Sequence, residues 1–254
     1  MKNKKVVTIG NTTLYHGDCF KVLSMLDMKF DAVISDPPFG LTNCPWDKAI
    51  PLDKFWEMLD HCTKQNANFV LFGCGGFTVD LINSKRKWFR YDQIWVKSKK
   101  CGHLNANLMP MRNHEQILVF GRPGFKKQTI YIPQKTLGGR AGVITRNHKS
   151  SIYRDTGEFV HTSDGSVHPS AVLVFASERG QHPTQKPVDL MEQLVRTYSN
   201  EGGTVLDCFM GSGSTAIACV RAGRAFTGIE QDREYFDLAV ERIEKAYAEK
   251  NDDK

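Results

Sequence analysis

The segment Asp36-Pro37-Pro38-Phe39 places a carboxylate next to two prolines and an aromatic ring. The prolines fix φ and remove two N–H donors, which leaves a rigid turn rich in hydrogen-bond acceptors. The Asp36 carboxylate and the Pro37 carbonyl can accept both hydrogens of an exocyclic amino group, while Phe39 stacks on the attached ring. The turn therefore predicts a site for a planar group that carries NH2; a Pro-Pro strand terminator beside an incidental acid is the alternative.

A glycine-rich turn, Asp207-Cys-Phe-Met-Gly211-Ser-Gly213-Ser-Thr, is the second segment whose residue types suggest chemistry. Glycine permits close backbone approach to a nucleotide-like ligand, and a following helix N-terminus offers free N–H groups. Glu230, which ends a later apolar run, can accept both hydroxyls of a ribose. The Gly-x-Gly-x-x-Ala spacing suits S-adenosylmethionine, nicotinamide or flavin cofactors, and also a purely structural turn. The lack of a Gly-Lys-Ser/Thr sequence argues against an ATPase-type phosphate loop.

Both segments follow short apolar runs, residues 31–35 and 204–206, which predict buried parallel strands. Similar runs occupy residues 69–72, 94–96, 117–120, 171–175 and 226–229. Helical patterns cover residues 20–26, 52–62, 188–198, 215–222 and 235–247, and residues 6–9 and 12–15 predict a hairpin. Strands that alternate with helices predict an α/β fold with a doubly wound, mostly parallel sheet, whose carboxyl ends bind ligands.

The formal net charge of +6 conceals an uneven distribution of charge along the chain. Residues 81–154 contain 16 Lys and Arg against two acids, Asp92 and Glu115, and residues 122–154 contain no acid. Such a basic stretch favours a polyanionic partner. Its last part has few periodic apolar residues and predicts an irregular insertion with a functional role, or a solvated linker as the alternative. The pair His114-Glu115 could face the site, although a structural pair is the favoured interpretation.

Composition and cysteine spacing narrow the class of protein. With 254 residues, 41% of them hydrophobic and 24% charged, the chain is long enough for a large globular core. No apolar run approaches the ~18 residues of a membrane span, and the N-terminal residues lead into a strand pattern instead of a signal peptide. We therefore expect a cytoplasmic protein. The seven cysteines are scattered without zinc-ligand spacing, which predicts reduced thiols and no metal site.

Three motifs carry a resemblance to a known family. Asp36-Pro-Pro-Phe39, His182-Pro-Thr-Gln-Lys186-Pro and the Asp207-x-Phe209-x-Gly211-Ser-Gly213 loop resemble the signatures of S-adenosylmethionine-dependent DNA amino-methyltransferases. The Pro-Pro motif, the basic region and the glycine loop follow one another as in the beta group of that family, and the likeness spans residues 14–247. The resemblance implies a Rossmann-like methyltransferase fold. Its catalytic domain would occupy residues 1–121 and 169–254, and a basic target-recognition insertion residues 122–168.

The resemblance also implies roles for individual residues. The expected holders of the flipped target base are Asp36, Pro37, Pro38 and Phe39. The expected S-adenosylmethionine contacts are Asp18, Cys19, Phe20, Asp36, His182, Thr184, Lys186, Asp207, Phe209, Gly211, Ser212, Gly213, Ser214, Thr215 and Glu230. Within this set, Asp18 would meet the adenine of the cofactor, Lys186 its methionine carboxylate and Glu230 its ribose. The expected DNA contacts, mainly to phosphates, are Lys97, Lys99, Lys100, Arg112, Lys126, Lys127, Arg140, Arg146 and Lys149.

The first residue of the Pro-Pro motif indicates the modified base, since Asp there accompanies adenine N6 in the family and Ser accompanies cytosine N4. Asp36 therefore favours direct, in-line methyl transfer to N6 of a flipped adenine in DNA, without a covalent intermediate. The alternative substrates with an amino group are cytosine N4, RNA and a glutamine amide. The alternative classes of protein are a nicotinamide-dependent oxidoreductase and a non-enzymatic nucleic-acid binder. DNA is the expected partner, and a homodimer and a cognate restriction endonuclease stay open.

Overall fold

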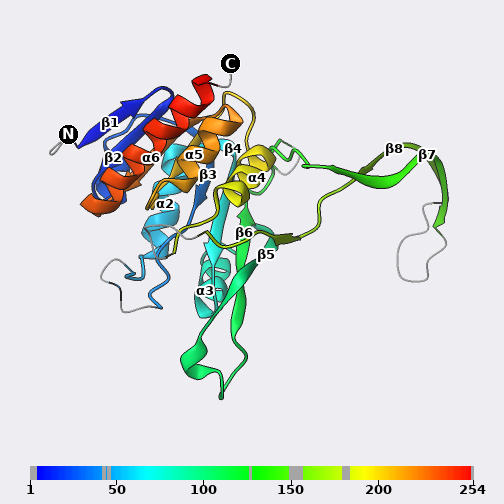
Figure 1. Ribbon diagram of the computed structural model, residues 1–254, viewed down its shortest axis with the longest axis horizontal. Coiled ribbons are helices and arrows are strands. Elements are labelled where there is room, and N and C mark those ends of the chain that lie inside the picture. Colours follow the sequence, from blue (N-terminus) through cyan, green and yellow to red (C-terminus); the bar gives the residue numbers. More distant parts are fainter. Residues whose placement is uncertain are drawn as a thin grey trace. The chain divides into compact units, whose positions relative to one another are not determined.

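The computed structural model describes residues 5–41, 44, 47–125, 128–148, 157–178 and 184–252 (Figure 1). The chain forms two compact units, one made of Met1–Ile132 with Ala171–Lys254 and the other of Pro133–Ser170. Four predicted site residues lie outside the described residues: Lys126, Lys127, Lys149 and His182. Within the described ranges, no helix is long and apolar enough to cross a membrane, and no three His, Cys, Asp or Glu side chains gather as a metal site would require.

The first unit is built around a mixed sheet, in which nine strands of the described chain are ordered β1-β2-β11-β10-β3-β4-β6-β5-β9. These strands are β1 (Val6–Ile9), β2 (Thr12–His16), β3 (Phe30–Ser35), β4 (Thr63–Gly73), β5 (Phe89–Cys101), β6 (Arg112–Phe120), β9 (Val172–Val174), β10 (Thr204–Asp207) and β11 (Ala225–Glu230). All neighbours are parallel except β1·β2, β4·β6 and β5·β6. The predicted α/β fold with a doubly wound, mostly parallel sheet is confirmed.

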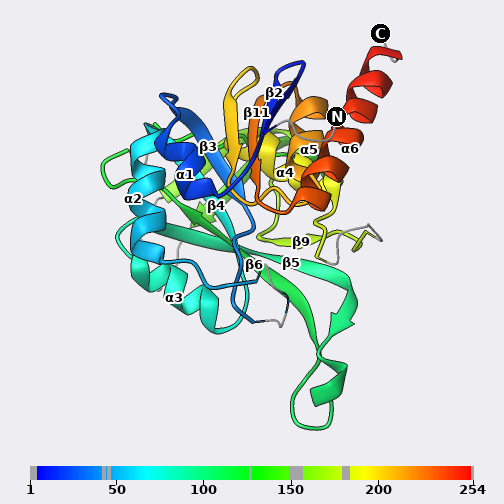
Figure 2. The same cartoon turned by 90° about the vertical axis from the view of Figure 1, so that its left-hand side faces the viewer.

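Helices cover both faces of this sheet (Figure 2). They are α1 (Cys19–Ser24), α2 (Leu52–Cys62), α3 (Gly76–Ser84), α4 (Val188–Tyr198), α5 (Ser214–Ala222) and α6 (Arg233–Asp252). Ile34 and Val70 belong to an apolar cluster with α4, α5 and α6, whereas their neighbours Val33 and Phe69 belong to one with α1, α2 and α3. Both faces of the strands are therefore buried, which explains their continuous apolar runs.

Strands β5 and β6 differ from the prediction, because they pair in the antiparallel sense. Only residues 102–111 join them, including the short 3-10 helix η1 (His103–Asn105), and parallel neighbours need a much longer crossover. Helix α3 was not predicted from the sequence either. It begins directly after Gly75, which has φ of +59°, so its start has the composition of a turn.

The second unit is a two-stranded antiparallel ribbon of β7 (Thr136–His148) and β8 (Gly157–Val167), where the sequence predicts an irregular segment. The apolar side chains Leu137, Val143 and Val160 are largely exposed on this ribbon. Backbone pairing holds the two strands, so the alternation of buried and exposed residues that identifies most strands does not arise in the sequence.

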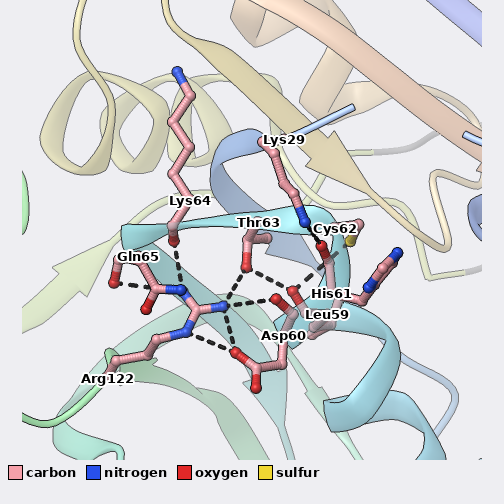
Figure 3. A network of polar contacts seen from close by, with 9 residues as sticks. All are labelled: Lys29, Leu59, Asp60, His61, Cys62, Thr63, Lys64, Gln65 and Arg122. Atoms are coloured by element: carbon pink, nitrogen blue, oxygen red, sulfur yellow. Dashed lines mark hydrogen bonds and ion pairs between the residues drawn. The ribbon is translucent and has the colours of Figure 1, made fainter. Parts of the chain in front are cut away.

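Arg122 ties the end of β6 to the junction between α2 and β4 (Figure 3). Its buried guanidinium group donates to the Asp60 carboxylate at 2.7 Å, to the Lys64 carbonyl at 2.5 Å and to the Thr63 hydroxyl at 2.8 Å. A buried cation requires partners of this kind, and these partners are all in the first unit. The predicted insertion begins at this arginine, whereas the second unit begins at Pro133.

Candidate active site

Three neighbouring strands end at the carboxyl edge of the sheet in or next to a carboxylate. Asp36 follows β3, Asp207 ends β10 and Glu230 ends β11. A cavity of about 330 Å³ lies at this edge, the usual place for a ligand in such sheets. Its wall contains most of the residues predicted to hold base and cofactor: Asp18, Cys19, Phe20, Asp36, Pro37, Pro38, Phe39, Thr184, Lys186, Asp207, Phe209, Gly211, Ser212, Ser214, Thr215 and Glu230.

The glycine loop is fixed by carboxylates on both sides. Asp207 is almost fully buried and accepts hydrogen bonds from the Ser35 and Thr215 hydroxyls, both at 2.6 Å, which joins β3 to the start of α5. The Gly211 N–H donates to Oε2 of Glu230 at 2.9 Å. Burial raises the pKa of both carboxyl groups, although these hydrogen bonds oppose the shift. The loop is thus held in one geometry by the protein itself.

Left-handed backbone at Gly211 and Gly213, with φ of +51° and +81°, explains why glycine is needed at both positions. Gly213 is the one described member of the predicted cofactor set that is not part of the cavity wall. A Cβ at this position would lie 3.1 Å from the Cβ of Ala239, so Gly213 instead allows α5 to approach α6 closely.

The two oxygens of the Asp36 carboxylate have different surroundings. Oδ2 accepts a hydrogen bond from the ammonium group of Lys186, whose side chain is 7% exposed. Oδ1 is buried and has no hydrogen-bond partner among the residues that the structure describes. Burial, opposed in part by Lys186, raises the pKa of Asp36 to about 6. Because buried acceptors are normally paired, Oδ1 marks a position that a donor group of a ligand can occupy.

Lys186 lies between two carboxylates of the protein. Its Nζ contacts Asp36 and is 3.4 Å from Oε2 of Glu115, whose Oε1 accepts a hydrogen bond from Lys97 at 2.9 Å. Burial alone would lower the pKa of Lys186, but the two carboxylates outweigh it and raise that pKa. The sequence predicts that this ammonium group pairs with the cofactor's carboxylate, and within the chain it pairs with these two carboxylates.

Contacts with residues outside the Pro-Pro turn hold its aromatic ring and the chain that follows it. The ring centroid of Phe39 lies 5.0 Å from that of Phe77 in α3. The buried carboxylate of Asp47 accepts the N–H groups of Gly40 at 2.8 Å and Leu41 at 3.0 Å, which fixes the chain directly after the turn. Contacts outside the turn therefore hold Phe39, which lines the same cavity as Asp36.

Asp18 combines a structural contact with a place in the cavity wall. Its Oδ1 accepts the N–H of Lys21 at 3.1 Å and so caps α1. The preceding residue, Gly17, donates its N–H to the carbonyl of Glu230 at 2.9 Å. This backbone bond brings the start of α1 next to the end of β11, so that the carboxylates predicted for the adenine and the ribose line one cavity.

The cavity wall also contains residues that the predicted site lacks, among them Glu115, Gln185 and Tyr235. Gln185 accepts a hydrogen bond from the Ser212 hydroxyl at 3.0 Å. The sequence favours Glu115 as a structural partner of His114, whereas the structure pairs it with Lys97 and Lys186. One signal could have found it, because Glu115 is one of only two acids in the basic stretch of the sequence.

The described residues predicted to contact DNA occupy both units. Three are exposed on β5 and β6, and two lie on β7: Lys99, Lys100 and Arg112, and Arg140 and Arg146. Lys97 differs from them, because its side chain is 12% exposed and is paired with Glu115. It belongs to the charge network of the cavity, and a phosphate would have to displace that carboxylate to reach it.

Sequence comparison finds the same family along most of the chain. The DNA methylase family model matches residues 30–241. The type II methyltransferase M2.DpnII of Streptococcus pneumoniae is 45% identical over 260 residues, which cover 91% of this chain and 89% of that protein. The DNA adenine methyltransferase YhdJ of Escherichia coli (strain K12) is 27% identical, with 92% of this chain and 83% of that protein covered.

Solved structures share the architecture. The M1.HpyAVI-SAM complex is similar with a TM-score of 0.66 and 24% identity, over 91% of this chain and 98% of that chain. The PvuII DNA methyltransferase, which is cytosine-N4-specific, is similar with a TM-score of 0.65 and 17% identity, over 95% of this chain and 93% of that chain. These two likenesses show the fold that the sheet and its helices adopt.

Proposed function

The chain belongs to the DNA methylase family of N6 and N4 enzymes, and on that premise we propose that it transfers a methyl group from S-adenosylmethionine to N6 of adenine in DNA. The observation that carries the proposal is the unpartnered, buried Oδ1 of Asp36, which shares one cavity with the glycine loop and Glu230. An acceptor in that place fits an amino group that donates hydrogen bonds. The name of the adenine methyltransferase YhdJ supports adenine as the base.

The cavity wall fits the proposed cofactor. Glu230 presents a carboxylate at the end of β11, where nucleotide folds bind ribose hydroxyls, and Asp18 offers a second acceptor for an adenine amino group. S-adenosylmethionine supplies a methyl group on a positively charged sulfur. Among the described residues of the wall, six carry a carboxylate (Asp18, Asp36, Asp47, Glu115, Asp207 and Glu230) and two carry an ammonium group (Lys48 and Lys186). This excess of negative charge favours a cationic ligand.

The Pro-Pro turn supplies the chemistry at the acceptor base. The adenine amino nitrogen is a poor nucleophile, because its lone pair is conjugated with the ring. Hydrogen bonds to Oδ1 of Asp36 and to the Pro37 carbonyl would favour a pyramidal nitrogen and stabilise the positive charge that develops. Phe39 offers a face on which the base can stack. Lys186 holds the other oxygen of Asp36, which fixes the orientation of the carboxylate.

Transfer is direct, so no cysteine acts as a nucleophile. With the cofactor bound, the bond from the amino nitrogen to the methyl carbon would form as the carbon–sulfur bond breaks, and Asp36 would accept one amino proton. Burial raises the pKa of the Cys19 thiol to about 12 and that of Cys208 well above its ordinary value. Both thiols of the cavity wall are therefore protonated at neutral pH and are weak nucleophiles.

We propose that the region around the second unit recognises the target sequence. The predicted insertion at residues 122–168 overlaps that unit. The exposed guanidinium group of Arg140 and the backbone polar groups of the β7–β8 ribbon would contact the DNA. The type II names of the relatives support a place in a restriction–modification system, with a cognate endonuclease as partner and the cytoplasm as location. We also propose that the protein is a homodimer, which light scattering of the purified protein would test.

One experiment tests the activity and the base together. The protein is incubated with methyl-labelled S-adenosylmethionine and unmethylated genomic DNA, and the digested nucleosides are separated. We expect label in N6-methyladenine. Label in N4-methylcytosine would overturn the choice of base, and no transfer to DNA would overturn the function. Modification-aware sequencing of the product then gives the recognition sequence.

A further inference from the structure

The β5–β6 finger, defined as residues 97–112, extends beyond the sheet at the edge that holds the cavity (Figure 2). β6 is antiparallel to β4 with Gly73 opposite Gln116, so the residues before Gln116 lie past the carboxyl end of β4. β5 follows β6 outward, with Val96 opposite His114. The finger therefore projects on the same side of the sheet as the ends of β3, β10 and β11.

The tip of the finger exposes three large apolar side chains. Leu104 is 87% exposed, Leu108 is 83% exposed and Met109 is 57% exposed. Single exposed apolar residues are common on protein surfaces, but three within six positions of a projecting tip form a patch that marks an interaction site. The tip therefore offers an apolar surface to a partner.

The stem of the finger indicates what that partner is. Lys99, Lys100 and Arg112 are exposed on it, and residues 93–114 contain no acid. A partner that meets this surface must combine negative charge with an apolar interior. The DNA duplex has both, since phosphates lie outside the stacked bases. Proteins that deform DNA insert leucine or methionine side chains between base steps in this way.

The finger is close enough to the cavity to reach the same stretch of DNA. Glu115 lines the cavity and follows Leu108 by seven residues, and an extended chain spans at most ~3.4 Å per residue. Leu108 thus lies within about 24 Å of Glu115, which is less than the ~34 Å of one turn of DNA. Lys97 at the base of the finger is also joined to Glu115 by the 2.9 Å ion pair.

We propose that the tip of the β5–β6 finger is a DNA wedge: Leu104, Leu108 and Met109 enter the base stack beside the target adenine and fill the space that it vacates. The stem lysines and Arg112 bind the adjoining phosphates. Flipping a base costs the stacking and pairing that hold it in the duplex, and a side chain that replaces the lost stacking lowers this cost. This inference rests on the proposed function.

The test uses two duplexes that contain the recognition sequence found by sequencing. In one, the target adenine faces thymine; in the other, it faces an abasic residue and is already unpaired. The double variant Leu104→Ser, Leu108→Ser should lose about tenfold or more in kcat/KM on the paired duplex and regain most of that loss on the abasic duplex. The control Met25→Ser, Met28→Ser alters two other exposed apolar residues and should behave as wild type on both.

Two results would overturn the wedge. One is an unchanged kcat/KM on the paired duplex; the other is an equal loss on both duplexes, which would place the defect in a step other than flipping. Light scattering gives a further outcome. If the molar mass of the double variant falls, and the ratio of its kcat/KM on the paired duplex to that on the abasic duplex equals that of the wild type, the tip is instead a contact between two copies of the chain. If the wild-type protein methylates neither duplex, the proposed function fails and the wedge fails with it.

Discussion

The ammonium group of Lys186 donates a hydrogen bond to Oδ2 of Asp36 and leaves Oδ1 of the same carboxylate buried and unpartnered among the described residues. The two residues are 150 positions apart in the sequence, and Glu115, 3.4 Å from Lys186, completes a row of alternating charges with Lys97. One cation therefore both orients the carboxylate and compensates its burial.

Replacement of Asp36 by alanine should abolish methyl transfer while S-adenosylmethionine still binds within a few-fold of wild type. In the proposed function Asp36 accepts the amino hydrogens, whereas the cofactor is assigned mainly to Glu230 and the glycine loop, which line the same cavity. Methyl transfer from labelled cofactor and calorimetric titration measure the two properties. The exposed Asp53→Ala serves as the control. Turnover by the Asp36 variant at even a tenth of the wild-type rate contradicts the assignment.

The rate of methyl transfer should fall as the pH is lowered through about 6. Burial raises the pKa of Asp36 to about 6, so the protonated form accumulates well above the pH at which an exposed aspartate is protonated. A protonated Asp36 loses its charge and stabilises a developing cation poorly. Single-turnover rates between pH 5 and 8, at saturating cofactor, report this titration. A rate that stays constant down to pH 5 would show that another group limits the reaction.

Glu115→Gln and Lys186→Met should move the acidic limb of that profile in opposite directions. The negative charge of Glu115 raises the pKa of Asp36, so its removal shifts the limb to lower pH. Lys186 lowers the pKa of Asp36, so its removal shifts the limb to higher pH and also releases Oδ2. Thermal melting confirms that both variants are folded. Shifts in the same direction would mean that the charge row does not act through Asp36.

Glu230→Gln should weaken S-adenosylmethionine binding by about tenfold or more, because hydrogen bonds to a charged acceptor contribute ~1.5–3 kcal/mol. The carboxylate accepts the N–H groups of Gly211 at 2.9 Å and Asp232 at 2.8 Å, and an amide in its place turns a donor toward one of them. Isothermal calorimetry gives the affinity. Glu234→Gln, an exposed neighbour, is the matched control and should leave it unchanged. Equal affinities of the two variants for S-adenosylmethionine would show that Glu230 does not bind the cofactor.

Arg122→Ala should lower the free energy of unfolding by about 3 kcal/mol, because it leaves buried and part-buried acceptors without their donor. The hydroxyl of Thr63 is the buried acceptor, and the part-buried carbonyl of Lys64 loses its bond as well. Urea denaturation followed by far-UV circular dichroism measures the loss. Arg221→Ala, whose side chain is 47% exposed, should change the value by less than about 0.5 kcal/mol. Similar losses for both would show that the network of Arg122 contributes little.

The motifs and the parallel core could be predicted from the sequence, because local pattern and burial coincide there. Val33 and Ile34 are adjacent in sequence and face opposite apolar clusters, so the run that contains them is apolar throughout. The partners of Lys186 could not be predicted in the same way. They depend on the approach of β6 to the end of β3, and nothing local to Glu115 distinguishes a cavity carboxylate from a surface one.

The second unit and the finger escaped prediction for a related reason. On the ribbon, Leu137 and Val143 are exposed, so the residues that usually reveal a strand by alternation have no buried side to face. In the finger, Leu104 and Leu108 resemble core residues by type but lie on the surface. Sequence pattern identifies elements that bury one face against a core, and these two segments do not.

The strand order also determines when the protein first becomes active during its synthesis. β10 lies between β3 and β11, and β11 pairs with β2, so the centre of the sheet is completed by strands from the C-terminal part of the chain. At ~5–20 residues per second, the ribosome delivers the Pro-Pro turn and the basic stretch well before the glycine loop. A nascent chain thus holds the basic stretch before its glycine loop, and the cavity cannot form until the C-terminal strands have been synthesised.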